Sequence, residues 1–515
     1  MRILIFHGYL LHGTGSNVYN ANLAESLARA GHEVHLLCQD READDLEWVD
    51  ATGDWDAGHL RVTPRREPAR VTVYRPDIGG VLPVYVADVY EGFDARPFPD
   101  LTDAELTRYL DANGKAVSEV ARAVRPDVAL ANHLVMGPAI LARALGPLGI
   151  PYAVKIHGSA LEYTVKPHPR FLPYAREGLA GARGVLVGSR HTAESLWAAM
   201  DEPGLKERTR LGPPGVDVTA FAPRTAADRA AGLEALLGRL RAGASTAGAP
   251  AAAGQSSFSR DLSAAVTALE QLDLQADRPV IFVGKLIGSK GVELLLAAWP
   301  LVLARVPDAR LVVVGFGAFR SGLEHLVGRL ASGDLEAAAG TRDETGAVLP
   351  WLEAFLTSLT PDEAASYRRA AIALPERVVW AGRLDHGELH DLLPAMEAMV
   401  VPSTFPEAFG MVAAEAAACG TLPVVAEHSG LAEVARTLAA AVPEPSRGLL
   451  SFPVGPDAVR RLGAAVADWL EAPGALRDAT RDALVATARE RYSWDGVART
   501  VLAAASGAID DLPTP

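Results

Sequence analysis

The sequence has little cysteine, a deficit of positive charge and no long apolar run. Its two cysteines, Cys38 and Cys419, are too few for a disulfide scaffold or a Cys-based zinc site. Lys and Arg number 49 against 63 Asp and Glu, and this net charge of −14 argues against nucleic acid as a partner. No run approaches the roughly 18 apolar residues of a membrane helix. We expect a cytoplasmic protein, with peripheral membrane contact left open.

The start of the chain is apolar but short. Residues 1–6 are followed by His7 and Gly8, which end the run well before the length of a signal peptide's apolar region. A buried first strand is the simpler interpretation. The remaining composition, 49% hydrophobic and 22% charged, is that of a soluble globular protein and excludes a disordered or fibrous chain.

Short β-branched runs alternate with helical stretches along the first 210 residues. A helix is predicted at Val18–Ala30, with Leu23 and Leu27 on one face. Continuous apolar strands between helices are typical of a parallel sheet covered on both faces. The predicted strands are Arg2–Phe6, Val34–Cys38, Asp127–Ala131, Tyr152–Ile156 and Gly184–Val187.

The same alternation restarts after about residue 210. A helix is predicted at Val292–Val306. The fold class is therefore α/β, with two doubly wound Rossmann-like domains and a cleft between them as the default ligand site. The predicted strands are Pro279–Val283, Ala309–Val314, Arg377–Trp380, Met399–Val401 and Leu422–Val425.

Three segments and two insertions describe the expected domain organisation. An N-terminal domain spans 1–211, and a C-terminal domain that begins with a Gly-Pro-Pro-Gly linker spans 212–490. A helix in 491–515 is expected to pack back on the N-terminal domain. The insertions are about 224–278, with a low-complexity and mobile stretch at 242–257, and about 318–376, which is helical with a start signal at Thr360. The second insertion is expected to shape an acceptor site.

A glycine-rich turn follows the first strand. Gly13, Gly15 and Ser16 let backbone N–H groups approach an anion at the start of a helix. The third glycine of the dinucleotide fingerprint is absent, and Asp40 is the sole acidic residue near the end of the second strand. A phosphate or sugar contact and a merely tight turn both remain open.

Two basic segments lie at the carboxyl ends of predicted strands. His157 follows one strand, at an edge where ligands bind in open α/β sheets, although a lone histidine at such a position is more often structural. Lys285 and Lys290 lie between a strand and a helix, and could neutralise a diphosphate or belong to an ordinary solvated loop.

A pair of glutamates is the most informative motif. Glu407 lies in a loop after a strand, and Glu415 lies inside an apolar helix, where a carboxylate needs a partner. If the segment is helical, eight residues span about 12 Å, which suits one glutamate on a sugar and the other on a ribose. The N–H groups of Phe409, Gly410 and Met411 would point at a diphosphate between them.

Two further segments carry less specific signals. His428 to Glu433 could close over a sugar, but is a common loop by itself. Asp54-Trp55-Asp56 has the Asp-x-Asp form of a metal–nucleotide site, yet it is predicted to lie in a polar loop without a preceding strand. No metal site is predicted.

Together these motifs resemble family 4 retaining glycosyltransferases of the GT-B fold, from residue 2 to about 505 apart from the insertions. Glu407 and Glu415 match the family's E-x7-E signature, and Gly284 to Gly291 resembles its G-R-L-x-x-x-K-G motif. Pro214-Gly215-Val216-Asp217 with Phe221 and Pro223 is similar to its linker motif. Val187-Gly188-Ser189 and Gly430 to Val434 also match.

The resemblance implies a role for each matching residue. Lys290 would bind the donor diphosphate, and Lys285, where the family usually has arginine, keeps the charge without the bidentate fork. Glu407 would contact the donor sugar, Glu415 the ribose, and His157 the donor sugar and acceptor. The Gly13–Ser16 loop would face the diphosphate and acceptor. Arg383 would lie beside the base.

The implied reaction is sugar transfer from a nucleotide-diphosphate sugar to an acceptor hydroxyl, with retention and without a metal or other cofactor. The acceptor, a small molecule, a glycan or a lipid-linked sugar, stays open, as does the donor's base. Two alternatives share the layout: a GT-B nucleotide-sugar 2-epimerase and a non-catalytic nucleotide-sugar binding protein. A sugar phosphorylase is disfavoured because no pyridoxal lysine motif is apparent.

Overall fold

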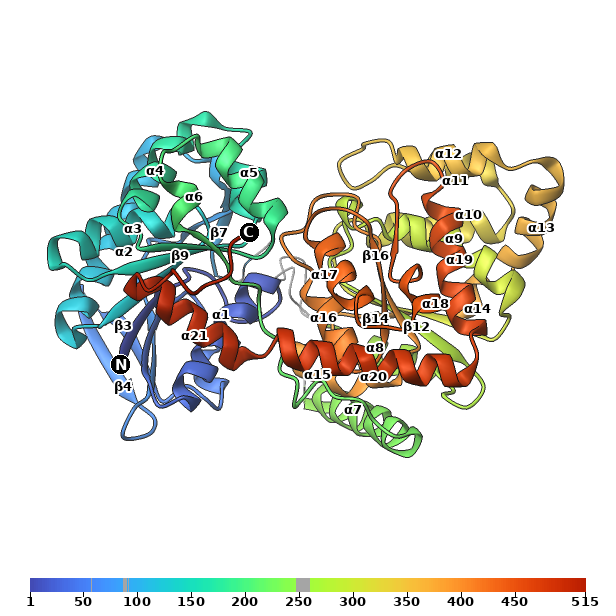
Figure 1. Cartoon of the computed structure of the whole chain (residues 1–515), viewed down its shortest axis with the longest axis horizontal. Coiled ribbons are helices and arrows are strands. Elements are labelled where there is room, and N and C mark those ends of the chain that lie inside the picture. Colours follow the sequence, from blue (N-terminus) through green and yellow to red (C-terminus); the bar gives the residue numbers. More distant parts are fainter. Residues whose placement is uncertain (57, 87–89, 91, 247–259) are drawn as a thin grey trace. The chain divides into compact units, whose positions relative to one another are not determined.

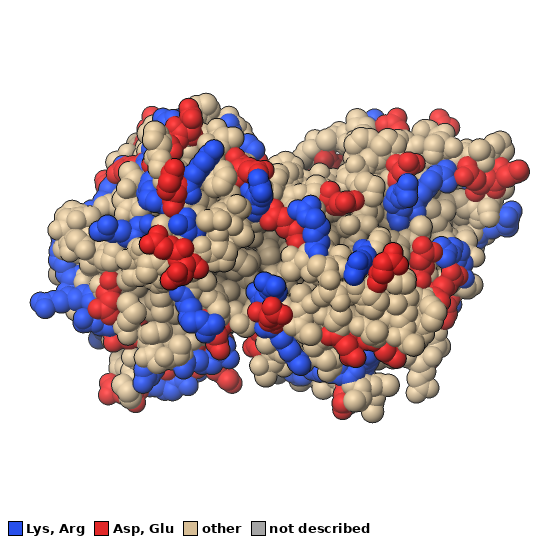
Figure 2. All heavy atoms as spheres, viewed as in Figure 1, with Lys and Arg blue, Asp and Glu red and all other residues tan. Residues whose placement is uncertain are grey.

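A computed structural model describes residues 1–515 except 57, 87–89, 91 and 247–259. The chain forms two compact units (Figure 1). Unit 1 contains Met1–Gly215 and, from the other end of the chain, Tyr492–Pro515. Unit 2 contains Val216–Arg491. Lys and Arg are interspersed with Asp and Glu over the face shown in Figure 2, so that face carries no large field of one sign.

The main sheet of unit 1 has the strand order β11-β10-β9-β8-β1-β2-β5-β3-β4. All neighbours are parallel except β3 and β4, which form an antiparallel pair at the edge. The order in which the chain adds strands reverses between β8 and β1, which is the topological switch point. The strands are β1 (Arg2–Phe6), β2 (Glu33–Leu37), β3 (Ala51–Asp56), β4 (His59–Pro64), β5 (Val71–Arg75), β8 (Val128–Asn132), β9 (Tyr152–Ile156), β10 (Gly184–Val187) and β11 (Thr209–Leu211).

Helices cover this sheet, and a small parallel pair, β6 (Val81–Val84) with β7 (Asp94–Pro97), lies apart from it. The longest helix begins with a capping box between Thr102 and Glu105. The helices are α1 (Gly15–Arg29), α2 (Asp103–Val124), α3 (Gly137–Leu145), α4 (Leu172–Ala180), α5 (Arg190–Met200), α6 (Leu205–Arg208) and α21 (Trp494–Ser506).

Helix α21 completes the core of unit 1. It packs on α1, β8, β9 and β10, and Figure 1 shows it, in dark red, beside the blue α1. Trp494 is 4% exposed, and its ring lies 5.5 Å from that of Tyr19. A Cβ at Gly215 would come within 2.6 Å of the Trp494 ring, so the chain needs glycine at this close approach.

Truncation of Trp494 tests this packing. Trp494→Ala is expected to lower the free energy of unfolding of unit 1 by about 3–5 kcal/mol, because it removes a large buried ring. Trp494→Phe is the matched control and should cost much less, since the indole nitrogen has no hydrogen-bond partner among the described residues. Urea denaturation of both variants measures the difference, and equal losses would contradict the packing argument.

The sheet of unit 2 is parallel throughout, with the order β14-β13-β12-β15-β16-β17. The order in which the chain adds strands reverses between β12 and β15, which is the topological switch point. The loops after these two strands therefore leave the sheet side by side. The strands are β12 (Arg278–Val283), β13 (Ala309–Val314), β14 (Val378–Gly382), β15 (Ala398–Val401), β16 (Leu422–Ala426) and β17 (Ser451–Phe452).

The helices of unit 2 include those of both insertions. The first insertion contains α7 (Ala226–Thr246) and α8 (Leu262–Leu269); residues 247–257 of the predicted mobile stretch lie outside the described residues, and 242–246 belong to α7. The second contains α10 (Arg320–Ala331), α11 (Leu335–Ala339), α12 (Pro350–Ser358), α13 (Pro361–Ala371) and α14 (Leu374–Arg377), and the predicted start at Thr360 is confirmed by a capping box.

The remaining helices flank the sheet of unit 2. They are α9 (Val292–Arg305), α15 (His386–Leu392), α16 (Met411–Ala418), α17 (Ser429–Ala439), α18 (Glu444–Arg447), α19 (Ala458–Glu471) and α20 (Gly474–Arg491). The predicted α/β class with parallel sheets is therefore confirmed in both units. Among the described residues, none of the helices combines the length and the apolarity that a membrane crossing requires.

Candidate functional site

Four polar side chains gather where β1, β8 and β9 of unit 1 end. His7 follows β1, Asn132 ends β8, His133 comes next, and His157 follows β9. The ring centres of His133 and His157 are 4.9 Å apart, and those of His7 and His133 are 6.0 Å apart. We call these four residues the histidine cluster. It lies at the switch point of the sheet, where sequence alone predicted only His157.

Asn132 orients the ring of His157. The Asn132 amide nitrogen donates to Phe6 O at 3.2 Å and to Asn20 Oδ1 at 2.7 Å, so its oxygen is the end that faces His157. His157 Nε2 lies 2.8 Å from that oxygen. In this arrangement Nε2 carries the hydrogen and donates it, because Asn132 Oδ1 can only accept. Nδ1 of neutral His157 is then an acceptor.

The histidine cluster is uncharged at neutral pH. Burial lowers the pKa of His7 to about 4, against hydrogen bonds to Asn17 and to Leu10 O that raise it. Burial, His133, Lys155 and His7 together lower the pKa of His157 well below its ordinary value. The pKa of the neighbouring Lys155, which donates to Gly212 O, is itself lowered by burial to about 7. A neutral His157 can accept a hydrogen bond from a hydroxyl group through Nδ1, since Nε2 donates to Asn132.

His133 is the strained member of the cluster. Its backbone has φ 67°, a left-handed conformation that is uncommon outside glycine, and it is 2% exposed. Neither ring nitrogen has a hydrogen-bond partner among the described residues. Strain and unsatisfied polar atoms are typical of functional positions. His133 was not predicted from the sequence, because it belongs to no motif and a lone histidine after a strand does not indicate a function.

The glycine-rich loop lies beside this cluster. Helix α1 begins at Gly15, earlier than predicted, and its N-cap residue Thr14 makes no side-chain cap, so Gly15 and Ser16 belong to the first turn. Gly13 has φ +89°, which only glycine adopts readily. Asp40 does not face a ligand here: its buried carboxylate accepts from Leu11 N at 2.7 Å and so positions the loop.

The second group of predicted residues meets at the switch point of unit 2. Lys290 and Ser403 both donate to Oε1 of Glu407, the serine at 2.7 Å. About a quarter of each charged side chain remains exposed, 29% for Lys290 and 24% for Glu407. Burial opposes ionisation of Glu407, but Lys290, Ser403 and His428 lower its pKa below the ordinary value. The structure therefore brings Lys290 and Glu407 together as an ion pair.

The backbone around this pair is fixed by close contacts. Glu407 N donates to Ser429 Oγ at 2.9 Å, and Gly430 N donates to Glu407 O at 2.9 Å. Helix α16 follows at once; its N-cap is Gly410, with φ 113°, and no side chain caps it. No side chain caps the first turn of α16, where an anion could be held. That the N–H groups of Phe409, Gly410 and Met411 face a diphosphate stays a prediction.

Glu415 lies inside α16, 2% exposed, and has a partner that the sequence did not indicate. His386, the first residue of α15, places Nε2 at 2.9 Å from Glu415 Oε1. Phe221, from the linker motif, packs on His386 with ring centres 5.0 Å apart. The carboxylate predicted for a ribose is therefore held by a histidine. The sequence indicated only that Glu415 needs a partner, because a buried carboxylate must be paired, and not which residue that partner is.

The pair His386–Glu415 predicts a pH-dependent stability of unit 2. Burial disfavours the charged ring, but the charge and hydrogen bond of Glu415 and the more distant Asp217 raise the pKa of His386 above 6.5. A raised pKa in the folded state means that the pair stabilises fully below pH 6.5 and less as pH rises through the folded-state pKa. His386→Gln should therefore destabilise by about 1–3 kcal/mol near pH 5.5 and by less near pH 9.

Thermal unfolding at the two pH values measures this difference. The exposed His325 of α10 supplies the control variant His325→Gln. A loss that is larger at high pH would contradict the assigned direction.

The two remaining predicted residues lie at the same edge of the unit 2 sheet. Lys285 follows β12 and is partly exposed. Arg383 follows β14, and its guanidinium pairs with Asp385 at 2.7 Å. The second insertion reaches this edge as well, because Glu344 accepts from Gly288 N at 2.8 Å. The insertion thus contacts the Lys285–Lys290 loop.

The Asp54-Trp55-Asp56 motif is not a loop, so that prediction was wrong. All three residues belong to β3, whose second half is polar because it lies near the edge of the sheet. Arg75 Nη2 pairs with Asp54 Oδ2 at 2.6 Å, and Trp55 donates to Glu119 at 2.9 Å. Within the described ranges, no group of three or more His, Cys, Asp or Glu side chains is arranged to hold a metal ion. Metal independence stays a prediction.

Two family models match the chain, and together they cover more than half of it. A glycosyl transferase 4-like domain matches residues 14–203, which lie in unit 1. A glycosyl transferases group 1 domain matches residues 362–491, which contain Glu407 and Glu415.

Curated relatives and solved structures agree with these matches. The chain is 27% identical over 443 residues to a D-inositol 3-phosphate glycosyltransferase of Nocardioides, covering 81% of this chain and 77% of the relative. It is 27% identical over 224 residues to the uncharacterized glycosyltransferase MJ1607 of Methanocaldococcus jannaschii, a match that spans 43% of each protein. The structure resembles Anabaena Alr3699/HepE, solved in complex with UDP and glucose, at 16% identity and a TM-score of 0.56 over 99% and 100% of the two chains.

Proposed function

Because the chain belongs to the GT4-type glycosyltransferases of the GT-B fold, we propose that it transfers a sugar from a nucleoside diphosphate sugar to an acceptor hydroxyl, with retention and without a metal. The observation that carries the proposal is the Lys290–Glu407 ion pair beside the uncapped start of α16. A cation, a carboxylate and free backbone N–H groups are what a sugar diphosphate needs.

The donor binds along the switch point of unit 2 in this proposal. Lys290, Lys285 and the first turn of α16 hold the diphosphate. Glu407, fixed by Ser403 and Ser429, accepts hydrogen bonds from donor sugar hydroxyls. Glu415 keeps one oxygen on His386 and offers the other to the ribose. Arg383 is held near the base by Asp385.

The proposed chemical step is a same-face substitution at the anomeric carbon. The bond from that carbon to the diphosphate oxygen breaks through an oxocarbenium-like transition state, and the acceptor oxygen forms its bond on the same face. The acceptor's proton passes to the departing phosphate oxygen, so no protein base is required. Lys290 and the α16 N–H groups stabilise the negative charge that develops on the diphosphate.

Unit 1 supplies the acceptor side in this proposal. The neutral His157 accepts a hydrogen bond from a sugar hydroxyl through Nδ1, since Nε2 is committed to Asn132. Gly13, Gly15 and Ser16 offer backbone N–H groups at the start of α1. The cytoplasm is the proposed compartment, because both cysteines are free and buried.

The relatives narrow the choice of substrates for a first test. The Nocardioides protein is described as acting on D-inositol 3-phosphate, and the Anabaena structure holds UDP and glucose. A UDP-sugar is therefore the first donor to test, and a phosphorylated or free polyol the first acceptor.

The experiment is a turnover screen of the purified protein with UDP-, GDP- and ADP-sugars in EDTA. We expect one nucleotide class to raise the melting temperature and to be slowly hydrolysed, and we expect the anomeric product to keep the donor's configuration. Glu407→Gln should abolish hydrolysis. Release of a rearranged free sugar would indicate an epimerase, and stabilisation without turnover would indicate a binding protein. No stabilisation by any nucleotide-sugar would overturn the proposal.

A further inference from the structure

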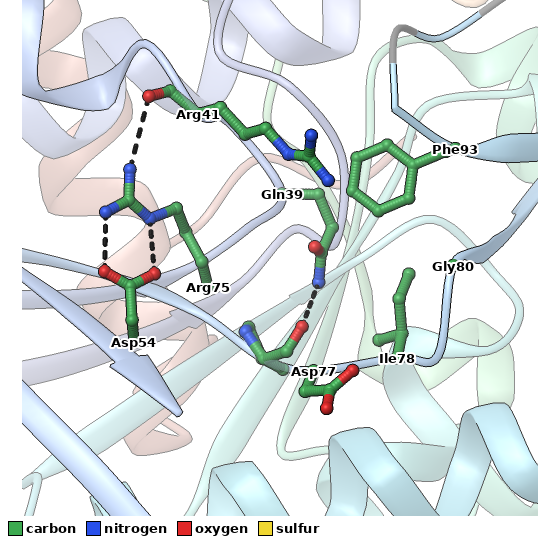
Figure 3. A pocket seen from close by; sticks show the side chains of 9 residues that line it. Gln39, Arg41, Asp54, Arg75, Asp77, Ile78, Gly80 and Phe93 are labelled. Atoms are coloured by element: carbon green, nitrogen blue, oxygen red, sulfur yellow. Dashed lines mark hydrogen bonds and ion pairs between the residues drawn. The ribbon is translucent and has the colours of Figure 1, made fainter. Parts of the chain in front are cut away.

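A cavity of about 350 Å³ opens at the carboxyl ends of β2, β3 and β5 in unit 1 (Figure 3). Gln39 follows β2, Asp54 lies in β3 and Arg75 ends β5. The volume lies in the range of small-molecule sites. Among the sequence motifs only Asp54-Trp55-Asp56 touches the cavity, through Asp54, and that motif was interpreted as a possible metal–nucleotide site.

The polar wall of the cavity is held in place by its own hydrogen bonds. Arg75 grips Asp54 with two bonds, Nε to Oδ1 at 2.7 Å and Nη2 to Oδ2 at 2.6 Å, and its Nη1 donates to Arg41 O at 3.2 Å. Gln39 donates to Pro76 O at 2.9 Å and is 5% exposed. Side chains fixed in this way can bind a ligand without losing further conformational freedom.

The chemistry of the lining favours a neutral ring that carries hydroxyl groups. Two arginines, Arg41 and Arg75, balance two carboxylates, Asp54 and Asp77, so the wall offers donors and acceptors with no net charge to select an anion. Phe93 adds an aromatic face, over which the Arg41 guanidinium lies 4.9 Å from the ring centre. Paired polar groups beside an aromatic ring suit the hydroxyls and the apolar C–H face of a sugar.

The cavity wall is tied to the candidate site. Asp40, between Gln39 and Arg41, accepts from Leu11 N at 2.7 Å and contacts His12 Nδ1 at 3.1 Å, so the loops after β1 and β2 form one unit. Strand β5 lies two places from β1, which His7 follows, and four places from β9, which His157 follows. These separations are roughly 10 Å and 19 Å. A chain of about four linked sugar rings spans the longer distance.

We propose that this cavity binds a distal sugar or polyol ring of the acceptor, while the reacting hydroxyl lies at His157 in the histidine cluster. The inference rests on the proposed glycosyl transfer and narrows its acceptor to chains of several linked rings. Phe93 and Arg41 are its recognition residues.

Direct binding tests the cavity without relying on turnover. Saturation-transfer NMR of the full chain with methyl α-glucoside and with methyl α-mannoside should show contact with a glycoside. Inorganic phosphate, which has no protons to observe, is added as a competitor and should not displace the glycoside. We expect Phe93→Ala and Arg41→Ala each to weaken it about tenfold, because each removes one face of the site. Arg75 bonds to the backbone of Arg41, so the second variant keeps the Arg75–Asp54 part of the wall. Val62→Ala, on the exposed strand β4, and Arg108→Ala, on the exposed face of α2, are the controls.

Kinetics with matched acceptors separate this inference from the proposed function. Wild type should use a tetrasaccharide about tenfold better than the matching disaccharide in kcat/KM, and Phe93→Ala should remove that preference. Equal use of both acceptors by the wild type, glycoside contacts that survive in Phe93→Ala, or displacement of the glycoside by phosphate would overturn the inference. Failure of the wild type to turn over any donor would instead overturn the proposed function.

Discussion

Lys290→Met is expected to reduce sugar transfer and donor hydrolysis by about 100- to 1,000-fold. The substitution keeps the length of the side chain but removes the cation beside Glu407, and that cation is proposed to stabilise charge on the leaving diphosphate. Loss of one such electrostatic contact costs about this much in other enzymes. Initial rates with the UDP-sugar that stabilises the wild type measure it, and Lys115→Met, an exposed lysine of α2, is the control.

A double variant separates chemistry from folding at this pair. Lys290→Met alone leaves the Glu407 carboxylate half-buried without its cation, and we expect a loss of about 1–2 kcal/mol in the stability of unit 2. Adding Glu407→Gln should restore most of that stability and none of the activity. If the double variant recovers activity together with stability, the pair serves only to hold the loop, and its catalytic role is wrong.

Asn132→Asp is expected to slow transfer by about 100-fold near pH 6 and by much less near pH 9. A carboxylate facing His157 Nε2 would raise the pKa of that ring, so at low pH Nδ1 gains a hydrogen and can no longer accept one. Because the pKa of His157 rises in this variant, its activity should be lost at low pH and retained at high pH. The groups that face or influence His157 are His133, His7, Lys155 and Tyr19.

The pH profile distinguishes positioning from packing. Wild-type His157 stays neutral across this range because its pKa lies well below the ordinary value, so its profile should lack the acid loss seen in the variant. Asn113→Asp, at a buried asparagine of α2 that donates to Tyr109 O, controls for burial of a carboxylate. A loss of activity in Asn132→Asp that is the same at all pH values would contradict the assigned tautomer.

Ten strands of the two sheets were predictable because their residues are largely apolar, whereas β3, β4, β5, β11 and β17 were not predicted. Tyr152–Ile156 and Ala309–Val314 match the predicted bounds, since strands covered on both faces need no polar position. Strand β3 was missed for the converse reason. It lies next to the edge strand β4, its outer half is exposed, and Asp54 therefore has the composition of a loop.

The motif residues of unit 2 were predictable as a group, but their partners were not. Lys290 and Glu407 lie 117 residues apart in the chain. Each matches a motif of the family, so both were predicted as site residues without knowledge of their contact. His386 belongs to no motif, and its position opposite Glu415 depends on how α15 packs. In unit 1 the bond from Asn132 to Phe6 spans 126 residues and requires the parallel register of β1 and β8. Spacing along the chain contains no such information.

Helix α21 has a consequence for how the chain is made. Residues 1–215 of unit 1 leave the ribosome before unit 2, yet unit 1 also needs residues 492–515, which follow the whole of unit 2. At 5–20 residues per second, synthesis of residues 216–491 takes roughly 14–55 s. During that time the apolar surface formed by α1, β8, β9 and β10 has no cover. The nascent N-terminal unit is thus a natural client for ribosome-associated chaperones, and it matures after the unit that is translated later.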